Sequence, residues 1–288
     1  GPPGTDLTHP TPGLAATNFV LVRNYGYAMY VAKDIGYQFW KAGLFTGMPI
    51  TRFGEQPSGR VLYSTDPSGE NVVDGHEFGR AQEIINVIDV RQSHPQLIVK
   101  TALALSNTPE GQTAYDNSHH LAYEVVTLEG QAMSGRKGIT LSIDEALTEA
   151  KRRALAVVAE NAQPTDPAGV AEAVGLGALR FSMVKSEARK IIDFRWEQAL
   201  SLQGDSAPYV QYAHARASSI LRQAAEQDID MANADYAQLG TLEVKLAQVL
   251  ERFNPTVQQA AQALAPNLVA QYLIDVAAAF NSYYNHRG

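Results

Sequence analysis

Aromatic and cationic side chains recur at helical spacing in residues 207–223, where the chain carries Tyr209, Tyr212, Arg216 and Arg222. Side chains three or four residues apart lie on one face of a helix, so these rings and guanidinium groups can share a surface. Proteins hold unpaired RNA bases by stacking them on aromatic rings and on arginine. The stretch is therefore a candidate surface for single-stranded RNA. The alternative is that each tyrosine packs into a helical core.

A second candidate, residues 131–138, reads Gln-Ala-Met-Ser-Gly-Arg-Lys-Gly. It lies after an expected strand and before an expected capped helix. Its hydroxyl (Ser134), its two cations (Arg136 and Lys137) and its two glycines suit a mobile turn that stabilises charge on a transferring phosphate chain. The alternative is an ordinary basic surface loop.

A third candidate is the pair of Tyr30 and Asp34. Tyr30 and Asp34 are four residues apart, so a helix would point an aromatic wall and a carboxylate into the same pocket. From spacing alone, a core tyrosine and a surface aspartate are the alternative. Residues 88–97 continue from a β-branched segment at residues 84–90 that predicts a buried strand, and α/β folds bind ligands at the carboxyl ends of strands.

The elements that must position these residues change in kind along the chain. Residues 19–22, 84–90 and 121–128 are expected strands and residues 29–40 an expected helix, an alternation that predicts an α/β fold with a parallel sheet. Residues 43–79 contain many glycines without sustained periodicity, which predicts a surface insertion or hairpin.

From residue 142 onward the pattern is helical. Ser142 and Glu145 form a capping box, which predicts a helix from there to about residue 161. A break follows at residues 163–167, after which Asp166 and Pro167 suit the start of another helix. Further helices are expected at residues 209–223, 239–253, 257–264 and 268–284.

Composition narrows the function classes. The 288 residues include no cysteine and seven histidines without metal-ligand spacing, which excludes disulfides and cysteine-ligated zinc. The net charge of −7 argues against indiscriminate nucleic-acid binding. Apolar runs are too short for a membrane span and the first residues do not form a signal peptide. We expect a soluble, cytoplasmic protein that binds neither DNA nor membranes.

The match from Ala207 to Arg216, together with Met133 to Gly138 upstream, resembles the arginyl-tRNA synthetase family of class I aminoacyl-tRNA synthetases. The resemblance extends from about residue 18 to residue 287. It implies an α/β region followed by an all-α region. The first would be part of a Rossmann-like nucleotide-binding domain at residues 1–165, with the insertion at about 43–80. The second would be an anticodon-binding helical bundle at residues 166–288.

The resemblance also implies roles for individual residues. Met133, Ser134, Arg136 and Lys137 would form the catalytic loop that closes over ATP, with His120, Met133, Ser134 and Lys137 binding the nucleotide. Tyr30, Asp34 and Gln92 would hold the substrate arginine, while Tyr209, Tyr212, Arg216, Arg222 and Tyr284 would contact tRNA. The chain departs from the family at Ala132, where a lysine is usual, and at Asn24-Tyr25-Gly26, where Ser-Asp-Gly is common.

The implied reaction is ATP-dependent formation of arginyl-adenylate and transfer of arginine to tRNA(Arg), without a covalent enzyme intermediate. L-arginine, ATP with Mg²⁺ and tRNA(Arg) would be the ligands of a monomer without a resident metal. The sequence lacks the family's His-Ile-Gly-His-like signature. We therefore expect a carboxyl-proximal part that lacks both ends and does not activate arginine alone. The alternative is a non-catalytic tRNA-binding module.

Overall fold

A computed structural model describes residues 20–45, 49–65, 79–132, 141–161, 164–229, 237 and 239–287. The chain divides into two compact units, Gly1–His120 and Leu121–Gly288, and each is described by itself.

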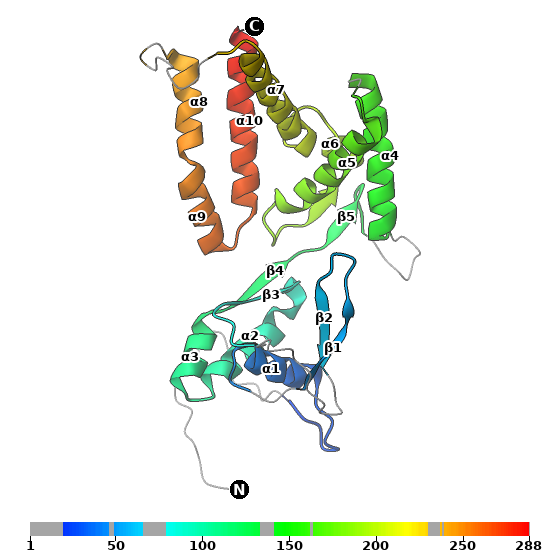
Figure 1. Cartoon of the computed structure of the whole chain (residues 1–288). Helices are drawn as coiled ribbons and strands as arrows, with labels where there is room; N and C mark the ends of the chain where they lie inside the picture. The colour runs from blue at the N-terminus through cyan, green and yellow to red at the C-terminus, as the bar shows by residue number, and fades with distance from the viewer. Residues whose placement is uncertain are drawn as a thin grey trace. The chain divides into compact units, whose positions relative to one another are not determined.

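The first unit combines short strands with three helices (Figure 1). Its elements are α1 (Tyr30–Lys41), β1 (Ile50–Glu55), β2 (Val61–Thr65), β3 (Ile84–Asp89), the 3₁₀ turn η1 (Val90–Gln92), α2 (Ser93–Ala104), α3 (Pro109–Asp116) and β4 (Ser118–Tyr123), whose last residues enter the second unit. α1 packs against α2, and α2 buries Val99 and Leu103 almost completely. The described part of the expected insertion is the antiparallel hairpin β1–β2, which confirms the hairpin interpretation there.

Two expected strands differ from the structure. Of the strand expected at residues 19–22, the described residues form a single bridge between Val22 and Ala28, because a turn at Gly26 (φ 81°) reverses the chain at once. The strand expected at residues 121–128 is two strands, β4 and β5 (Val126–Leu128). They separate at Glu124, whose backbone N–H donates to the carbonyl of Ala188 at 2.8 Å.

The second unit begins with a small sheet and two long helices. Its elements are β5, β6 (Gln131–Ala132), α4 (Ile143–Asn161), α5 (Pro167–Val184), β7 (Ile192–Phe194) and α6 (Trp196–Ala199). β5 lies between β6, which is antiparallel to it, and β7, which is parallel. Both predicted helix starts are confirmed. The Glu145 N–H donates to Ser142 Oγ (3.2 Å) while Glu145 Oε2 accepts from the Ser142 N–H (2.8 Å), and Asp166 accepts from the Gly169 N–H (2.9 Å).

Small residues let α4 and α5 approach closely. Ala150, Ala154, Ala171 and Ala178 are buried in a core that also contains Phe194 and Trp196 in edge-to-face contact. At Gly175 the helices are so close that an added Cβ atom would lie 2.8 Å from the Ala150 carbonyl. The predicted domain boundary near residue 165 falls between these two packed helices. The boundary itself stays a prediction.

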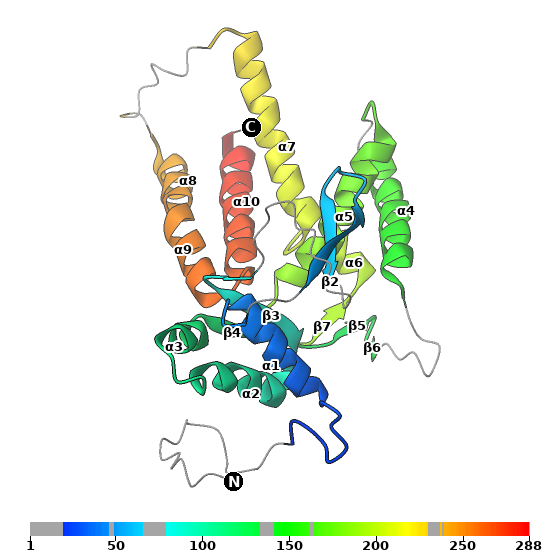
Figure 2. The ribbon, with the colours of Figure 1, turned by 60° about the horizontal axis from the view of Figure 1, so that its bottom comes forward.

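Four helices complete the second unit: α7 (Ala207–Glu226), α8 (Thr241–Glu251), α9 (Phe253–Ala263) and α10 (Asn267–Arg287). α10 packs against α7 on one flank and against α8 and α9 on the other, an arrangement visible in Figures 1 and 2. These helices confirm the four that the sequence predicts. Within the described residues, no helix combines the length and apolar character needed to cross a membrane.

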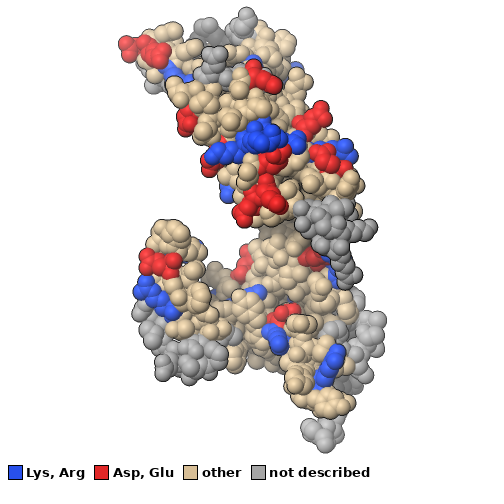
Figure 3. All heavy atoms as spheres, turned by 90° about the vertical axis from the view of Figure 1, so that its right-hand side faces the viewer, with Lys and Arg blue, Asp and Glu red and all other residues tan. Residues whose placement is uncertain are grey.

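Acidic and basic side chains neighbour one another on the surface shown in Figure 3. On α4, Glu149 accepts hydrogen bonds from Arg152 (2.7 Å) and from Arg153 (2.6 Å). These hydrogen bonds, the one from Arg152 contributing most and the one from Arg153 next, lower the pKa of Glu149 from 4.5 to about 2. The positive charges of Arg152 and Arg153 are thus partly neutralised within their own helix.

We expect Gly175→Ala to lower the free energy of unfolding by about 1–3 kcal/mol, because the new methyl group must push the α4 backbone away. Gly177→Ala is the matched control, since its Cβ atom would meet the movable end of the Gln211 side chain. The two variants are compared by urea denaturation. Equal stability of both variants would contradict close packing at Gly175.

Glu149 should also give the second unit a pH-dependent stability. Because folding depresses its pKa, the stabilisation is present above the unfolded value near 4.5 and is lost as pH falls towards about 2. Unfolding measured between pH 5 and pH 2.5 should therefore depend less steeply on pH in Glu149→Gln than in the parent chain. Identical slopes would show that the two arginine bonds do not persist in solution.

Candidate functional site

Three of the predicted RNA-binding side chains meet between α7 and α10. The guanidinium carbon of Arg216 lies 4.2 Å from the ring centre of Tyr212 and 4.7 Å from that of Tyr284. Arg216 Nη2 donates to the Tyr212 hydroxyl at 2.9 Å, and Nη1 donates to Asn281 Oδ1 at 3.2 Å. We call Tyr212, Arg216, Asn281 and Tyr284 the Arg216 cluster.

Local sequence explains how the cluster forms. Ser206 caps α7 by accepting the Tyr209 N–H at 3.2 Å, and Pro208 follows in the first turn. Tyr212 and Arg216 are one helical turn apart and therefore meet on one face of α7. From α10, Asn281 and Tyr284 are three residues apart and lie on the face that packs against α7.

The arrangement determines which groups remain free to bind. The rings of Tyr212 and Tyr284 both make cation–π contacts with the Arg216 guanidinium, and this attraction stabilises the cluster. Tyr212 is 45% exposed and Tyr284 37% exposed, so parts of both rings remain accessible to solvent. The cluster can offer aromatic surface next to a fixed positive charge.

The structure leaves two predicted tRNA contacts outside the cluster. Tyr209 is half-buried in the first turn of α7, and its side chain makes no hydrogen bond to another described residue. Arg222 is exposed further along the same helix, also without such a partner. Among the described residues, no hydrogen bond or cation–π contact joins either of them to the cluster, and their tRNA-binding roles stay predictions.

Sequence reasoning missed Asn281, which is 8% exposed. The last helix has an apolar stripe in which Leu268, Tyr272, Val276, Phe280 and Tyr284 recur every four residues. The signal was an asparagine next to Phe280 of this stripe. That stripe does form core where Tyr272 is buried and donates to the Leu250 carbonyl at 3.2 Å. At Tyr284 the same stripe reaches the exposed cluster.

In the first unit, Tyr30 and Asp34 lie on α1 and both are exposed, Tyr30 to 83%. Lys33 lies 5.9 Å from the Tyr30 ring centre. Gln92 ends η1 and is also exposed, and among the described residues no hydrogen bond joins it to Tyr30 or Asp34. The structure therefore places these three side chains within one compact unit but does not bring them into contact.

A hollow of about 370 Å³ lies beside Tyr30. Its lining comes from the turn before α1 and the first turn of the helix, and comprises Arg23, Tyr25, Tyr27, Ala28, Met29, Tyr30 and Lys33. No carboxylate belongs to this lining. Asp34 therefore presents its charge outside the hollow.

A polar network, which sequence analysis did not predict, fixes α1. Gln38 is 1% exposed and donates to Ser118 Oγ at 2.7 Å. Lys41 Nζ donates to Asn86 Oδ1 at 3.0 Å, and Asn86 Nδ2 donates to Gln96 Oε1 at 2.9 Å. Buried polar groups need such partners, so the network ties α1 to β3, β4 and α2.

Burial lowers the pKa of Lys41 below its usual 10.5, while the nearby carboxylate of Asp34 acts in the opposite direction. The charges of Lys41 and Asp34 therefore attract each other along α1, the helix that also carries Tyr30. His120 is held at a different point of the unit, where its Nε2–H donates to the Ile88 carbonyl at 3.0 Å. This bond leaves Nδ1 as the free acceptor of the ring.

The predicted ATP-loop residues Met133, Ser134, Arg136 and Lys137 lie outside the described residues. The structure describes what flanks them: β6 ends at Ala132, and Ser142 caps α4. A strand before this segment and a capped helix after it agree with the sequence prediction. Among the described residues, no group of three metal-ligating side chains is present.

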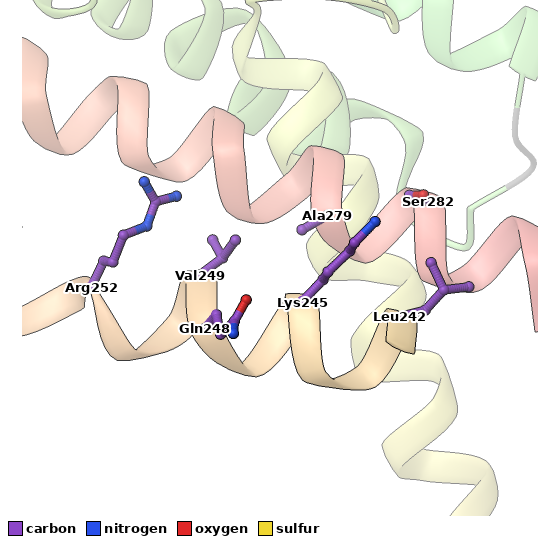
Figure 4. A pocket seen from close by; sticks show the side chains of 7 residues that line it. All are labelled: Leu242, Lys245, Gln248, Val249, Arg252, Ala279 and Ser282. Atoms are coloured by element: carbon purple, nitrogen blue, oxygen red, sulfur yellow. The ribbon is translucent and has the colours of Figure 1, made fainter. Parts of the chain in front are cut away.

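A second hollow, of about 470 Å³, lies between α8 and α10. Figure 4 shows Lys245, Val249 and Arg252 pointing from α8 towards α10, with Ala279 and Ser282 opposite. Arg252 Nη2 lies 3.3 Å from Asp275 Oδ2, which partly neutralises this rim. The bundle thus has a cation-rimmed surface on the flank of α10 away from α7, for which the sequence predicted no role.

Family models match both halves of the chain. The model described as "tRNA synthetases class I (R), catalytic domain" matches residues 29–196, and the "DALR anticodon binding domain" matches residues 210–287. The Arg216 cluster lies entirely within the second match. Tyr30, Asp34, Gln92 and His120 lie within the first.

Relatives named arginine–tRNA ligase support the same grouping. The Deinococcus radiodurans protein is 48% identical over 97% of this chain and 46% of its own length, and a Thermus thermophilus protein is 49% identical over 98% and 46%. The solved Thermus thermophilus arginyl-tRNA synthetase superposes with a TM-score of 0.83 at 47% identity, covering 95% of this chain and 44% of that one. A Plasmodium falciparum arginyl-tRNA synthetase at 15% identity and a TM-score of 0.65 shares the fold.

The chain spans about half the length of the curated relatives it matches. The matches confirm the predicted order of fold classes, with a mixed α/β catalytic region followed by a helical anticodon-binding region. The catalytic-domain model alone covers more than half of the 288 residues. On this basis, the chain belongs to the class I arginyl-tRNA synthetase family.

Proposed function

We propose that the chain forms the arginine-selecting and anticodon-reading part of an arginine–tRNA ligase. The enzyme would use ATP, with its Mg²⁺, to form arginyl-adenylate and would then transfer arginine to the terminal ribose of tRNA(Arg). The observation that carries this proposal is the Arg216 cluster, because it joins three predicted tRNA contacts within the anticodon-binding match.

The cluster has the chemistry that unpaired anticodon bases require. The accessible parts of the Tyr212 and Tyr284 rings provide stacking surfaces, and Arg216 supplies a positive charge for a nearby phosphate. Tyr209 and Arg222, on the same helix, would extend the contact along the RNA. A local surface of this kind explains how a chain with a net charge of −7 could bind tRNA selectively.

Arginine would be selected at α1. The carboxylate of Asp34 can accept charge-assisted hydrogen bonds from a guanidinium, and the exposed ring of Tyr30 can form one wall of the pocket. Gln92, at the end of β3 and η1, would reach the same substrate. The network of Gln38, Lys41 and Asn86 supports this role because it fixes the helix that carries Tyr30 and Asp34.

ATP would bind at residues 133–138. Ser134, Arg136 and Lys137 would stabilise charge on the phosphate chain, Met133 would belong to the same loop, and His120 would lie near the nucleotide. Such catalysis depends on positioning and charge stabilisation and needs no protein nucleophile.

A non-catalytic tRNA-binding module is the second candidate, because the anticodon-binding match at residues 210–287 would account for RNA binding without catalysis. Against it stand Tyr30, Asp34 and the buried network beneath them. A protein that only binds RNA has no physical need for a carboxylate and an aromatic ring on a helix held so firmly. We therefore favour the ligase.

We expect Tyr284→Leu to weaken binding of tRNA(Arg) by about 1–3 kcal/mol, because a stacking surface is lost. Fluorescence titration at fixed salt with tRNA(Arg), and with the same tRNA carrying an altered anticodon, measures the effect. The altered tRNA should bind the parent chain weakly and should respond little to the substitution. Tyr115→Leu, on α3 of the first unit, is the control. Equal weakening by both substitutions would contradict anticodon reading by the cluster.

Arginine selection can be tested in a synthetase in which this chain replaces the matching segment of the Deinococcus radiodurans relative. Asp34→Asn should raise KM for L-arginine about 10- to 100-fold, because charge-assisted hydrogen bonds to the substrate guanidinium are lost, and should leave KM for tRNA(Arg) unchanged. Asp116→Asn, at the end of α3, is the control. A change confined to kcat, or shared by the control, would refute substrate binding by Asp34.

A further inference from the structure

Asn281 is a buried amide on the otherwise apolar face that α10 turns towards α7. It is 8% exposed, and its Oδ1 accepts a hydrogen bond from Arg216 Nη1 at 3.2 Å. Ala277, also buried, and Phe280, 6.1 Å from the Tyr284 ring centre, lie on the same helix. A polar residue in such a place stays satisfied only through its partner, so Asn281 and Arg216 depend on each other.

The hydrogen bond from Arg216 to Asn281 sets the rotation of the guanidinium plane. Both tyrosine rings contact the guanidinium, and the Tyr212 hydroxyl accepts a hydrogen bond from Nη2. Asn281 holds Nη1 from the opposite helix. With both terminal nitrogens bound, the plane cannot turn without breaking a hydrogen bond.

We propose that Asn281 is a positioning residue for tRNA recognition, acting through Arg216 to fix the Tyr212 and Tyr284 rings. This inference rests on the proposed anticodon-reading function. An asparagine suits the role because it accepts a hydrogen bond without neutralising Arg216. The guanidinium therefore keeps its full charge for RNA while its orientation stays fixed.

The competing explanation is that Asn281 merely ties α10 to α7. The two explanations predict different effects on the affinities for the two tRNAs. A tie between helices would alter thermal stability and would weaken every RNA equally. A positioning residue would alter discrimination between anticodons, and its effect would disappear once Arg216 no longer offers a planar, two-pronged donor.

A double-mutant cycle on the full chain separates these explanations. Asn281→Leu removes the acceptor at similar volume, Arg216→Lys removes the planar donor, and Asn285→Leu, exposed one turn further along α10, is the matched control. Each variant is titrated with tRNA(Arg) and with the anticodon-altered tRNA, and thermal melting checks that each variant folds.

We expect Asn281→Leu and Arg216→Lys each to weaken binding of the unaltered tRNA about ten-fold and to leave the altered tRNA nearly unaffected. The double variant should be no weaker than either single variant, and Asn285→Leu should match the parent chain. Additive losses, or equal losses with both tRNAs, would overturn the proposal.

Asn281→Asp provides an independent arm, because it keeps the acceptor and adds a negative charge beside Arg216. It should preserve the orientation of the guanidinium but reduce the slope of log Kd against log salt by about 0.7–0.9, the value of one phosphate contact. An unchanged slope would overturn the claim that Arg216 must keep its charge.

Nitrogen-15 NMR of the free chain tests positioning without RNA. A fixed guanidinium should give separate Nη1 and Nη2 signals for Arg216, and Asn281→Leu should average them. Averaged signals in the parent chain would overturn the positioning role. If the signals are separate but the parent chain does not distinguish the two tRNAs, the proposed anticodon function fails while the Asn281–Arg216 constraint stands.

Discussion

The proposed binding surface of the second unit depends on one interaction, the cation–π contact of the Arg216 guanidinium with the rings of Tyr212 and Tyr284. Two of these residues come from α7 and one from α10, so the contact joins helices that are distant in sequence. Both rings are partly exposed beside this charge, so the cluster offers aromatic surface and a positive charge together. Asn281, also on α10, accepts a hydrogen bond from the same guanidinium.

The first unit uses the same physical strategy with different chemistry. Buried amides and one lysine hold α1 in place, and the exposed face of that helix carries Tyr30 and Asp34. In both units, a buried polar contact orients side chains that would meet a ligand. Such contacts are costly to leave unmade, which makes them effective at fixing one geometry.

The sequence predicted features that depend on neighbouring residues, such as helix caps. It did not predict features that depend on contacts between residues distant in sequence. The capping box of Ser142 and the cap at Asp166 are short-range features, and both helices begin where expected. The strand expected at residues 19–22 is reduced, in its described part, to one bridge, since the turn at Gly26 outweighs β propensity. Asn281 and the Lys41 network escaped prediction because their partners lie 65 and 45 residues away. The arginine, ATP and tRNA contacts stay predictions.

The most direct test of the account is a cross-linking experiment with tRNA(Arg) that carries 4-thiouridine in its anticodon loop. After irradiation of the complex, mass spectrometry identifies the attached peptide. The account predicts attachment within α7 or the last turns of α10, at or next to Tyr212 or Tyr284. Attachment confined to other helices, with binding intact, would contradict the central claim that the Arg216 cluster reads the anticodon.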